Sequence, residues 1–413
     1  MPGYGSSYWA DRTSARQRPS FTAYRGRSTA DAVIIGGGLT GCAAAHVLAA
    51  AGYDVVLLEA ERLAGGSTAA SLGAILPEPD AGFREIEAAH GRRLARTAWK
   101  QTHRAALEMG SALRKLPVKR ELSPADLILA ARSGDAGAEL AREQAARKKA
   151  GLVAPSIPPR QAARELGTAS TATVRSRGGF VYDPVRAALA MARAAAAEGA
   201  RVHERSTVTR TKFTRRLATV VLEQGAIETP FVFVATGGPG RLFSQLRRHV
   251  RRQEGYAVIT APLSAAMRRE AGRRHAVVCE PGADPRWLRW LPQDRALFAG
   301  APGKPVPARQ PKQREKRLAQ RTGQLMYEFS VRYPVISGLP PNWAWPLPVL
   351  SAPDGLPWIG AHRNYPFHFF AIAFGWHGDA LAWWAARAAL RALRDEARKE
   401  DDVFGFGRLG VRS

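Results

Sequence analysis

The chain has 413 residues, of which 46% are hydrophobic and 23% charged, and its formal net charge is +26 at pH 7. This length and hydrophobic content exclude a small disulfide-scaffolded protein and predict a globular protein of two or more domains. The two cysteines, Cys42 and Cys279, provide neither a disulfide framework nor a cysteine pair for a metal, so we expect no metal site.

The first part of the chain gives no targeting signal. Residues 1–30 contain no apolar run of about 7–15 residues, which a secretory signal peptide requires. The longest apolar stretch, 367–386, is interrupted by His377 and Asp379, which argues against a membrane span. We therefore expect a cytoplasmic protein without a membrane span.

The most informative local feature is a glycine-rich turn. An apolar, β-branched run at 32–35 predicts a strand, and small apolar residues at 42–51 predict a helix. Between them, Gly36 permits a tight turn, Gly38 lets the backbone approach a pyrophosphate, and Gly41 lets the helix pack close to the strand. The helix N-terminus would then face the phosphates.

A second apolar run at 55–58 predicts the next strand, which ends at Glu59. A carboxylate at this place in a strand–helix–strand unit can accept a hydrogen bond from a ribose hydroxyl. A glycine motif alone is weak, because glycine-rich turns also occur as plain loops. Here the expected elements flank it on both sides, and the unit predicts a dinucleotide site.

The following segment, 61–76, is rich in Gly, Ser and Ala and predicts a loop whose backbone can approach a planar ligand closely. An ordinary flexible loop is the alternative interpretation. Further along, the sequence predicts helices at 84–116 and 137–150, with a strand at 126–131 between them.

Another helix is predicted at 184–198, where Asp183 can cap the N-terminus and Pro184 fits the first turn. Strands are predicted at 202–208 and 231–237, so the sheet begun at 32–35 is completed about 200 residues later. Flavoproteins often interrupt a nucleotide domain in this way. We find no second glycine fingerprint for a nicotinamide cofactor, so we expect the substrate itself to donate the electrons.

The positive charge is spread along the chain, mostly as arginine, with its densest clusters at 247–252 and 312–321. A basic surface can bind nucleic acid, anionic lipid or acidic substrates. No aromatic residues are interleaved in these clusters to stack bases, and no known nucleic-acid module is present. This favours a general compositional bias, with a nucleic-acid partner as the alternative.

Together, these features resemble the D-amino acid oxidase-like superfamily of flavin oxidoreductases, which includes glycine, sarcosine and gamma-glutamylputrescine oxidases. The resemblance covers most of the chain and rests on the order and spacing of several segments. These are Tyr8-Trp9, the Gly36 fingerprint, 66–73, Asp183-Pro184, 202–208, 235–237, 352–360 and 374–379.

The resemblance implies an α/β fold with an α+β insert. A discontinuous Rossmann-like FAD-binding domain would comprise 1–76, 181–246 and 345–413. A second, sheet-based substrate domain would comprise 77–180 and 247–344, with a strand pair at 287–292 and 297–300 near the catalytic face.

The resemblance also places FAD along the chain, with its pyrophosphate at the Gly36 turn, its ribose on Glu59 and its adenine near Val208. The flavin ring would lie along Ser67 and 71–73, with the turn at 375–380 near its pyrimidine edge. There, the N-terminus of the following helix would stabilise an anionic reduced flavin. The expected cofactor-binding residues are Gly36, Gly38, Leu39, Thr40, Gly41, Glu59, Ala60, Gly66, Ser67, Ser71, Leu72, Gly73, Val208, Ala235, Thr236, Gly237, Gly375, Trp376, His377, Gly378, Asp379 and Ala380.

The chain departs from its relatives at two positions. In the amino acid oxidases, an arginine that grips the substrate carboxylate stands five residues before the matching aspartate, and here that position is Val349. In sarcosine oxidase, a cysteine seven residues before it holds the flavin covalently, and here that position is Leu347. We therefore expect noncovalent FAD. Glycine and D-amino acids become less favoured substrates, leaving amines, or acids gripped from another position.

Candidate substrate residues are Tyr256, Trp287, Arg289 and Trp345. The aromatic ones fit a cage for a cationic amine as well as they fit a core. Arg289 is the stronger functional candidate, because an arginine between two tryptophans in a buried strand needs a partner. His377 is a candidate base, although its turn mainly offers backbone groups.

The sequence thus predicts a FAD-dependent oxidase or dehydrogenase that oxidises the C–N bond of an amine or amino acid to an imine, with oxygen or another electron acceptor. Two alternatives remain open at this point. One is a flavoenzyme domain acting on modified tRNA or another nucleic acid. The other is a flavin-bearing subunit without turnover of its own.

Overall fold

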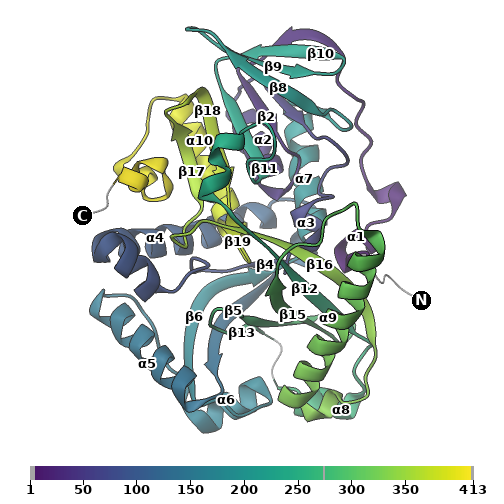
Figure 1. Cartoon of the computed structure of the whole chain (residues 1–413), viewed down its shortest axis with the longest axis vertical. Helices are drawn as coiled ribbons and strands as arrows, with labels where there is room; N and C mark the ends of the chain where they lie inside the picture. Colours follow the sequence, from purple (N-terminus) through teal and green to yellow (C-terminus); the bar gives the residue numbers. More distant parts are fainter. Residues whose placement is uncertain (1–4, 273–274, 411–413) are drawn as a thin grey trace.

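A computed structural model describes residues 5–272 and 275–410. Its strands form three sheets, which Figure 1 shows stacked along the long axis of the molecule. The strands are β1 (Gly26–Thr29), β2 (Ala32–Ile35), β3 (Val55–Leu58), β4 (Ala74–Ile75), β5 (Ser123–Ala131), β6 (Ala172–Val181), β7 (Arg201–His203), β8 (Val208–Phe213), β9 (Ala218–Leu222), β10 (Gly225–Thr229), β11 (Val232–Gly237), β12 (Arg251–Thr260), β13 (Ala276–Glu280), β14 (Arg286–Leu291), β15 (Arg295–Gly303), β16 (Pro341–Ser351), β17 (Trp358–His362), β18 (Tyr365–Ile372) and β19 (Phe374–Gly375).

Helices cover the two larger sheets. They are α1 (Tyr8–Asp11), α2 (Leu39–Ala49), α3 (Ser67–Ala70), α4 (Phe83–Arg114), α5 (Gly134–Lys149), α6 (Pro159–Leu166), α7 (Pro184–Ala197), α8 (Ala265–Glu270), α9 (Pro311–Arg332) and α10 (Asp379–Leu393). Short 3₁₀ segments occur between them. Among the residues that the structure describes, no helix is both long enough and apolar enough to cross a bilayer.

The first large sheet has the strand order β17-β18-β11-β2-β3-β7, and its pairs from β18 to β7 are parallel. Both of its faces are buried, as the continuous apolar run of β2 requires. Ala32 and Ile34 face α2, α7 and α10, whereas Val33 and Ile35 pack against the small sheet β1-β10-β9-β8. This three-layer arrangement holds the carboxyl ends of β2, β3 and β11 side by side.

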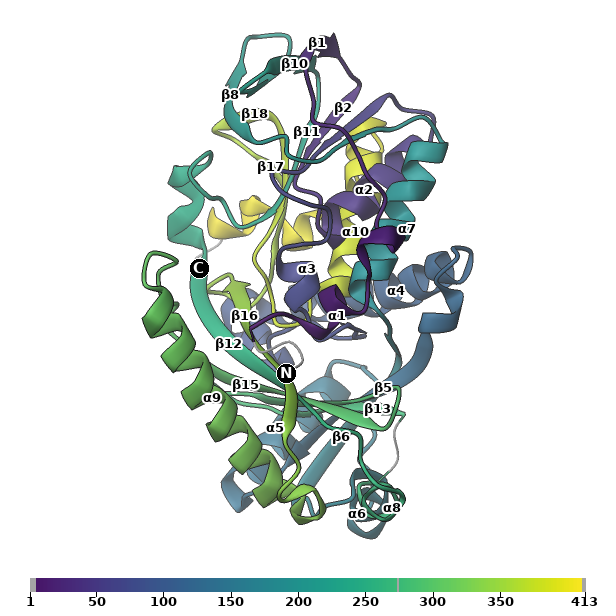
Figure 2. The same cartoon turned by 90° about the vertical axis from the view of Figure 1, so that its right-hand side faces the viewer.

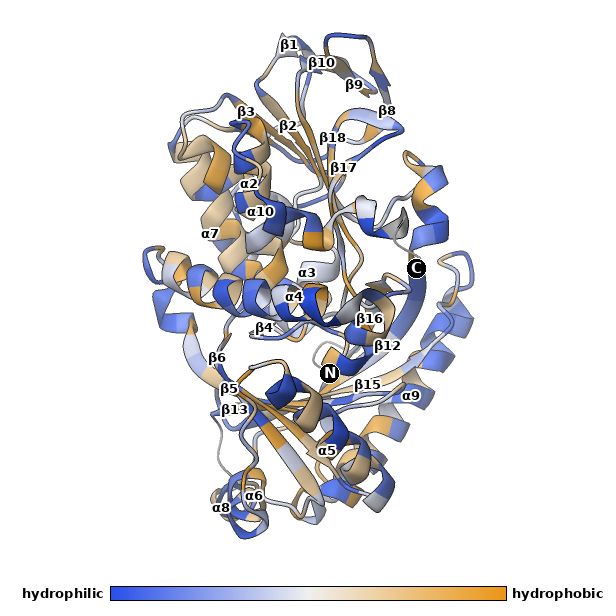
Figure 3. Cartoon of the chain, turned by 90° about the vertical axis from the view of Figure 1, so that its left-hand side faces the viewer, coloured by the Kyte–Doolittle hydropathy of each residue, from blue (hydrophilic) through white to orange (hydrophobic). Residues whose placement is uncertain are grey.

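The second large sheet has nine strands in the order β19-β16-β12-β15-β14-β13-β5-β6-β4. On one face, Tyr256, Phe298 and their neighbours pack against Phe329 and other residues of α9, and Figure 2 shows α9 lying across this outer face. The opposite face, which includes Trp287 and Trp345, belongs to the same core as α2 and α10. Figure 3 shows apolar residues gathered in the strands, and hydrophilic residues along α4 and α9.

Most predicted elements occur close to their expected bounds, but two predictions are wrong. The strand expected at 202–208 is two strands in different sheets, β7 and β8, because the chain turns at Arg205, whose φ is +50°. The loop expected at 61–76 contains α3 and β4. The division into two discontinuous domains stays a proposal. The two large sheets follow that division broadly, although β16 runs across the boundary proposed between 344 and 345.

Candidate active site

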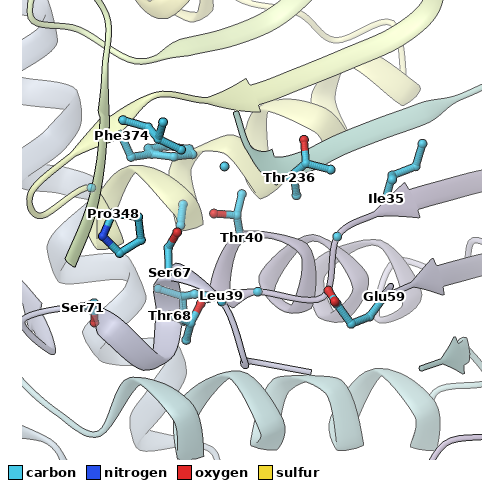
Figure 4. A pocket seen from close by; sticks show the side chains of 18 of the residues that line it. Ile35, Leu39, Thr40, Glu59, Ser67, Thr68, Ser71, Thr236, Pro348 and Phe374 are labelled. Atoms are coloured by element: carbon cyan, nitrogen blue, oxygen red, sulfur yellow. Dashed lines mark hydrogen bonds between the residues drawn. The ribbon is translucent and has the colours of Figure 1, made fainter. Parts of the chain in front are cut away.

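A cavity of about 420 Å³ lies where the carboxyl ends of β2, β3 and β11 meet β16 and β19. Figure 4 shows side chains from both large sheets around it, with Glu59 and Ile35 at one end and Pro348 and Phe374 toward the other. The carboxyl edge of a parallel sheet is where α/β folds bind nucleotides. The cavity therefore stands where the sequence predicts the cofactor.

The glycine turn forms one wall of this cavity. Gly36 has φ +107°, and a Cβ atom built there would lie 2.6 Å from the carbonyl oxygen of Ala235 in β11. Gly38 is the N-cap of α2, and the Leu39 N–H donates to Thr68 Oγ1 at 2.8 Å. A Cβ on Gly41 would lie 1.8 Å from the Gly36 carbonyl oxygen. The backbone is thus open to a ligand at the N-terminus of α2, as an anionic pyrophosphate requires.

Glu59 is oriented by the backbone around it. Its Oε2 accepts a hydrogen bond from the Gly37 N–H at 2.6 Å, and its Oε1 accepts one from the Glu61 N–H at 2.9 Å. Each carboxylate oxygen keeps a further lone pair. The side chain lines the cavity and so remains available to a ribose hydroxyl.

Many of the expected cofactor residues line the cavity. They are Gly36, Gly38, Leu39, Thr40, Glu59, Ala60, Gly66, Ser67, Ser71, Val208, Ala235, Thr236, Gly237, Gly375, Trp376, Gly378 and Asp379. The other five expected residues are not among those that line it: Gly41, Leu72, Gly73, His377 and Ala380. Their roles in binding stay predictions, as do those of the lining residues.

Sequence reasoning missed several lining residues, among them Thr68, Ser206, Thr207, Leu242, Pro348 and Phe374. Thr68 had a local signal, since it lies inside the small-residue segment that was expected to approach the flavin. Ser206 and Thr207 were hidden by the prediction of one unbroken strand at 202–208. The positions where β16 meets the cavity include Leu347 and Val349, the two departures from the relatives.

The four candidate substrate residues do not form one group. Trp287, Arg289 and Trp345 come from β14 and β16. Trp287 and Trp345 belong to the core shared with α2 and α10, whereas Tyr256 belongs to the core against α9 and donates its hydroxyl to Glu254. Tyr256 therefore packs on the face of the nine-stranded sheet opposite to Trp287 and Trp345. None of the four is among the residues that line the cavity.

Arg289 is bound to backbone rather than to a carboxylate. Its Nη1 donates to the carbonyl oxygens of Leu72, at 2.8 Å, and Gly73, and its guanidinium lies over the ring of Trp9. Burial lowers the pKa of Arg289 to about 10, because little solvent reaches its charge. Its observed contacts hold the protein chain, and a contact with substrate stays a prediction.

The N-terminus of α10 places a buried carboxyl group at the cavity. Asp379 accepts a hydrogen bond from the Tyr182 hydroxyl at 2.8 Å, while burial raises the pKa of Asp379 to about 6. The Tyr182 hydrogen bond and the charge of Arg289 favour ionisation but only partly offset that burial. This carboxyl group therefore changes its charge near neutral pH.

His377 lies behind the turn rather than on the cavity wall. Its Nε2 is 3.4 Å from Asp80 Oδ1, its ring packs edge-to-face on Trp287, and its Nδ1 has no partner among the described residues. Burial lowers the pKa of His377 to about 4. A neutral imidazole with so low a pKa is a weak base at neutral pH, which disfavours it as the general base.

We expect Asp80 to make stability depend on pH. Burial raises its pKa from 3.8 to about 7, although the Trp376 N–H favours the charged form. The folded state then binds this proton more tightly than the unfolded state, so this contribution is present below pH 4 and is lost as pH rises through about 7. Relative to wild type, Asp80→Asn should gain ~2–4 kcal/mol between pH 4 and pH 8.

Thermal unfolding of both proteins across this pH range measures the effect. The difference reports Asp80 together with His377, whose Nε2 is 3.4 Å from Asp80 Oδ1, whereas distant titrating groups contribute equally to both proteins. A difference that stays constant from pH 4 to pH 8 would contradict the expected titration.

Several known proteins are similar to this chain over most of its length. The curated gamma-glutamylputrescine oxidoreductase of Escherichia coli (strain K12) is 25% identical over 409 residues, which cover 97% of this chain and 92% of that protein. The structure of glycine oxidase from Geobacillus kaustophilus has a TM-score of 0.74 at 17% identity, over 92% of this chain and 98% of that one. L-amino acid deaminase from Proteus myxofaciens, in complex with anthranilate, has a TM-score of 0.75 at 17% identity, over 99% of both chains.

The two solved structures share the fold, which confirms the predicted α/β architecture with a second sheet domain. A family model described as FAD dependent oxidoreductase (DAO) matches residues 31–392, from just before β2 to the last turn of α10. This match confirms the resemblance stated from the sequence, and with it FAD as the cofactor of an oxidoreductase. The chain belongs to the FAD dependent oxidoreductase (DAO) family.

Proposed function

We propose that this oxidoreductase oxidises the C–N bond of an amine, with FAD held noncovalently in the cavity. The observation that carries the proposal is the chemistry of the cavity wall. Glu59 lies at the end assigned to the ribose of FAD. Toward the other end, the wall includes the carboxylate of Asp379, and β16 contributes the apolar Leu347 and Val349. A carboxylate among apolar groups suits an amine better than a substrate carboxylate, which prefers arginine.

The names of the relatives support the same class of reaction. The Escherichia coli protein is named for gamma-glutamylputrescine, and the solved structures for glycine and L-amino acids. Leu347 carries no group that could bond covalently to a flavin, which supports noncovalent binding. Gly36, Gly38 and the N-terminus of α2 would hold the pyrophosphate, and Glu59 would hold a ribose.

FAD, when bound, would supply the hydride acceptor: the substrate carbon would give up a hydride, the nitrogen would lose a proton to solvent, and C–N would become C=N. Water then hydrolyses the imine to a carbonyl compound and a free amine. In this reaction the residues of the chain would orient the cofactor and the substrate and would stabilise the charge that develops. The N-terminus of α10, at Asp379, directs its positive dipole toward the cavity, where it would stabilise negative charge that develops on reduction.

An anaerobic titration of the purified holoprotein tests this proposal. The flavin absorption bands are followed while amines, N-methyl amino acids and D-amino acids are added one at a time. We expect an amine without a carboxylate to bleach the bands. Because the neutral amine reacts, the rate at subsaturating amine should rise by up to roughly tenfold per pH unit below the pKa of the amine.

Two results would count against the proposal: a rate of bleaching that is flat from pH 6 to 10, or bleaching by D-amino acids alone. Bands that no compound bleaches would favour a nucleic-acid substrate or a subunit without turnover of its own. RNA binding that weakens steeply with salt would then separate these two alternatives. Admitting air after reduction distinguishes oxygen from another electron acceptor.

A further inference from the structure

Four consecutive carbonyl groups beside the cavity are each held by a side chain from a distant part of the sequence. Trp345 Nε1 donates to the carbonyl oxygen of Ala70 at 3.1 Å, and Trp9 Nε1 donates to that of Ser71 at 2.9 Å. Arg289 Nη1 donates to the next two, those of Leu72 and Gly73. Each carbonyl oxygen in the segment 70–73 therefore accepts a hydrogen bond from a side chain.

The three donors are buried, and two of them are in contact. Trp9 and Trp345 are each 1% exposed and Arg289 is 4% exposed, and the guanidinium of Arg289 lies 4.9 Å from the ring centroid of Trp9. They come from α1, β14 and β16, so only the complete fold assembles them. We call Trp9, Arg289 and Trp345 the carbonyl clamp.

The backbone conformation of Gly73 leaves room for the guanidinium of Arg289. Its φ is +66°, and a Cβ atom there would lie 2.2 Å from Arg289 Nη1, so only glycine lets the guanidinium reach the backbone. The Gly73 carbonyl oxygen also accepts the Tyr182 N–H at 3.0 Å. Burying an arginine against neutral carbonyl groups is costly, and Arg289 Nε has no partner among the described residues. An apolar side chain would pack there at a lower cost, so packing alone does not account for Arg289.

The clamped segment continues into the cavity wall. It begins at the last residue of α3, and Ser71 lines the cavity together with Ser67 and Thr68 of α3. The Ser71 Oγ accepts the Gly73 N–H at 3.1 Å, which leaves its hydroxyl hydrogen free to donate elsewhere. Fixing carbonyl groups 70–73 therefore fixes the polar groups that α3 and Ser71 present to the cavity, as Figure 4 shows for Ser67, Thr68 and Ser71.

We propose that Trp9, Arg289 and Trp345 are positioning residues for FAD: by holding carbonyl groups 70–73, they preorganise the wall formed by α3 and Ser71 before the cofactor binds. The proposal rests on the placement of the flavin along this segment, which is part of the proposed function. It does not depend on which substrate is oxidised. Preorganised contacts improve affinity because less ordering is needed on binding.

Phenylalanine substitutions isolate the hydrogen bonds. Trp9→Phe and Trp345→Phe keep an aromatic ring but remove the N–H, which leaves the Ser71 or Ala70 carbonyl group buried without that donor. Each should weaken FAD binding roughly 5- to 20-fold. Arg289→Met removes two bonds and should weaken it roughly 50-fold or more. FAD affinity is measured by titrating apoprotein and following the quenching of flavin fluorescence, with no substrate present.

Trp358→Phe is the matched control. Trp358 in β17 is also 1% exposed, and its Nε1 also donates to a backbone carbonyl oxygen, that of His249 at 2.8 Å, which lies outside segment 70–73. We expect this variant to bind FAD as wild type does. The visible spectrum and reduction potential of the FAD-saturated variants provide a readout that general destabilisation would not move. Both should shift in the Trp9 and Trp345 variants and not in the control.

Wild-type FAD affinity, spectrum and potential in both phenylalanine variants would overturn the proposal. So would a lower melting temperature of the apoprotein with unchanged affinity, because the residues would then only support the fold. Should Arg289→Met fail to fold, the phenylalanine variants still decide. Failure of every amine to reduce the flavin would overturn the proposed substrate class but leave these binding measurements, and the clamp, intact.

Discussion

Gly36→Ala is expected to fold and to purify without FAD, with an affinity for the cofactor at least ~100-fold below wild type, or ~3 kcal/mol. Two effects combine at this residue. Its φ of +107° is strained for alanine, and the new Cβ would lie 2.6 Å from the carbonyl oxygen and 2.8 Å from the carbonyl carbon of Ala235. Because both atoms belong to the backbone of β11, the glycine turn must move away from the strand, and the N-terminus of α2 moves with it.

Gly52→Ala is the control that separates backbone strain at a positive φ from a steric clash of the new Cβ atom. Gly52 follows α2 with φ +88°, yet a Cβ atom there would meet nothing within 4 Å. Alanine should cost about 1–2 kcal/mol of stability at this site and leave FAD affinity unchanged. Affinity is measured by titrating the apoproteins with FAD, and folding by circular dichroism. Tight FAD binding by Gly36→Ala would contradict the placement of the pyrophosphate at this turn.

Arg147→Met should have the largest effect on stability, lowering the free energy of unfolding by ~3–5 kcal/mol. Arg147 in α5 is 2% exposed, donates to Glu78 at 2.6 Å and to Glu143 at 2.8 Å, and lies over the ring of Trp99. Methionine keeps much of the packing but removes the positive charge. Among the residues that the structure describes, the Glu78 carboxylate, itself 4% exposed, would then keep only the Ser176 hydroxyl as a donor.

Urea denaturation of the holoprotein measures this loss, and α5 supplies its own control. Arg142 is exposed and pairs with Glu139 in the same helix, so Arg142→Met should leave the denaturation midpoint close to that of wild type. The double variant Arg147→Met/Glu78→Met should recover most of the loss, because the Glu78 charge is removed as well, and the Glu143 carboxylate still accepts the N–H groups of Phe83 and Arg84. Equal effects of the two single arginine variants would contradict a special role for the buried group.

The dinucleotide-binding unit could be predicted because its signals are local. The apolar run at 32–35 coincides with β2, and the Asp183 cap coincides with the start of α7, where its side chain accepts the Arg186 N–H. Strand propensity, glycine spacing and capping all depend on residues close in sequence. The long helix expected at 84–116 agrees with α4 to within one or two residues at its ends, but Gly91, with φ +79°, interrupts it with a kink that was not predicted from the sequence.

The positions of the candidate substrate residues could not be predicted with the same reliability, because they depend on which face of the nine-stranded sheet each side chain occupies. β12 is buried on both faces, with Ala257 in one core and Tyr256 in the other. Alternation of apolar and polar residues, which would identify the inner face of a half-exposed strand, is then lost. The contacts of Arg289 with Leu72 and Gly73 join residues more than 200 positions apart in the sequence, and no local sequence pattern predicts them.

The order of strands in the parallel sheet constrains how this protein can acquire its cofactor during synthesis. β2 ends at Ile35, but β11 begins at Val232 and β18, which completes the parallel core, begins at Tyr365. At a translation rate of ~5–20 residues per second, β18 leaves the ribosome roughly 15–70 s after β2. The glycine turn thus emerges early, whereas β11, the strand it packs against, follows about 200 residues later, and β18, which pairs with β11, emerges later still. A nascent chain should therefore rely on chaperones over this interval and load FAD only after β18 has emerged.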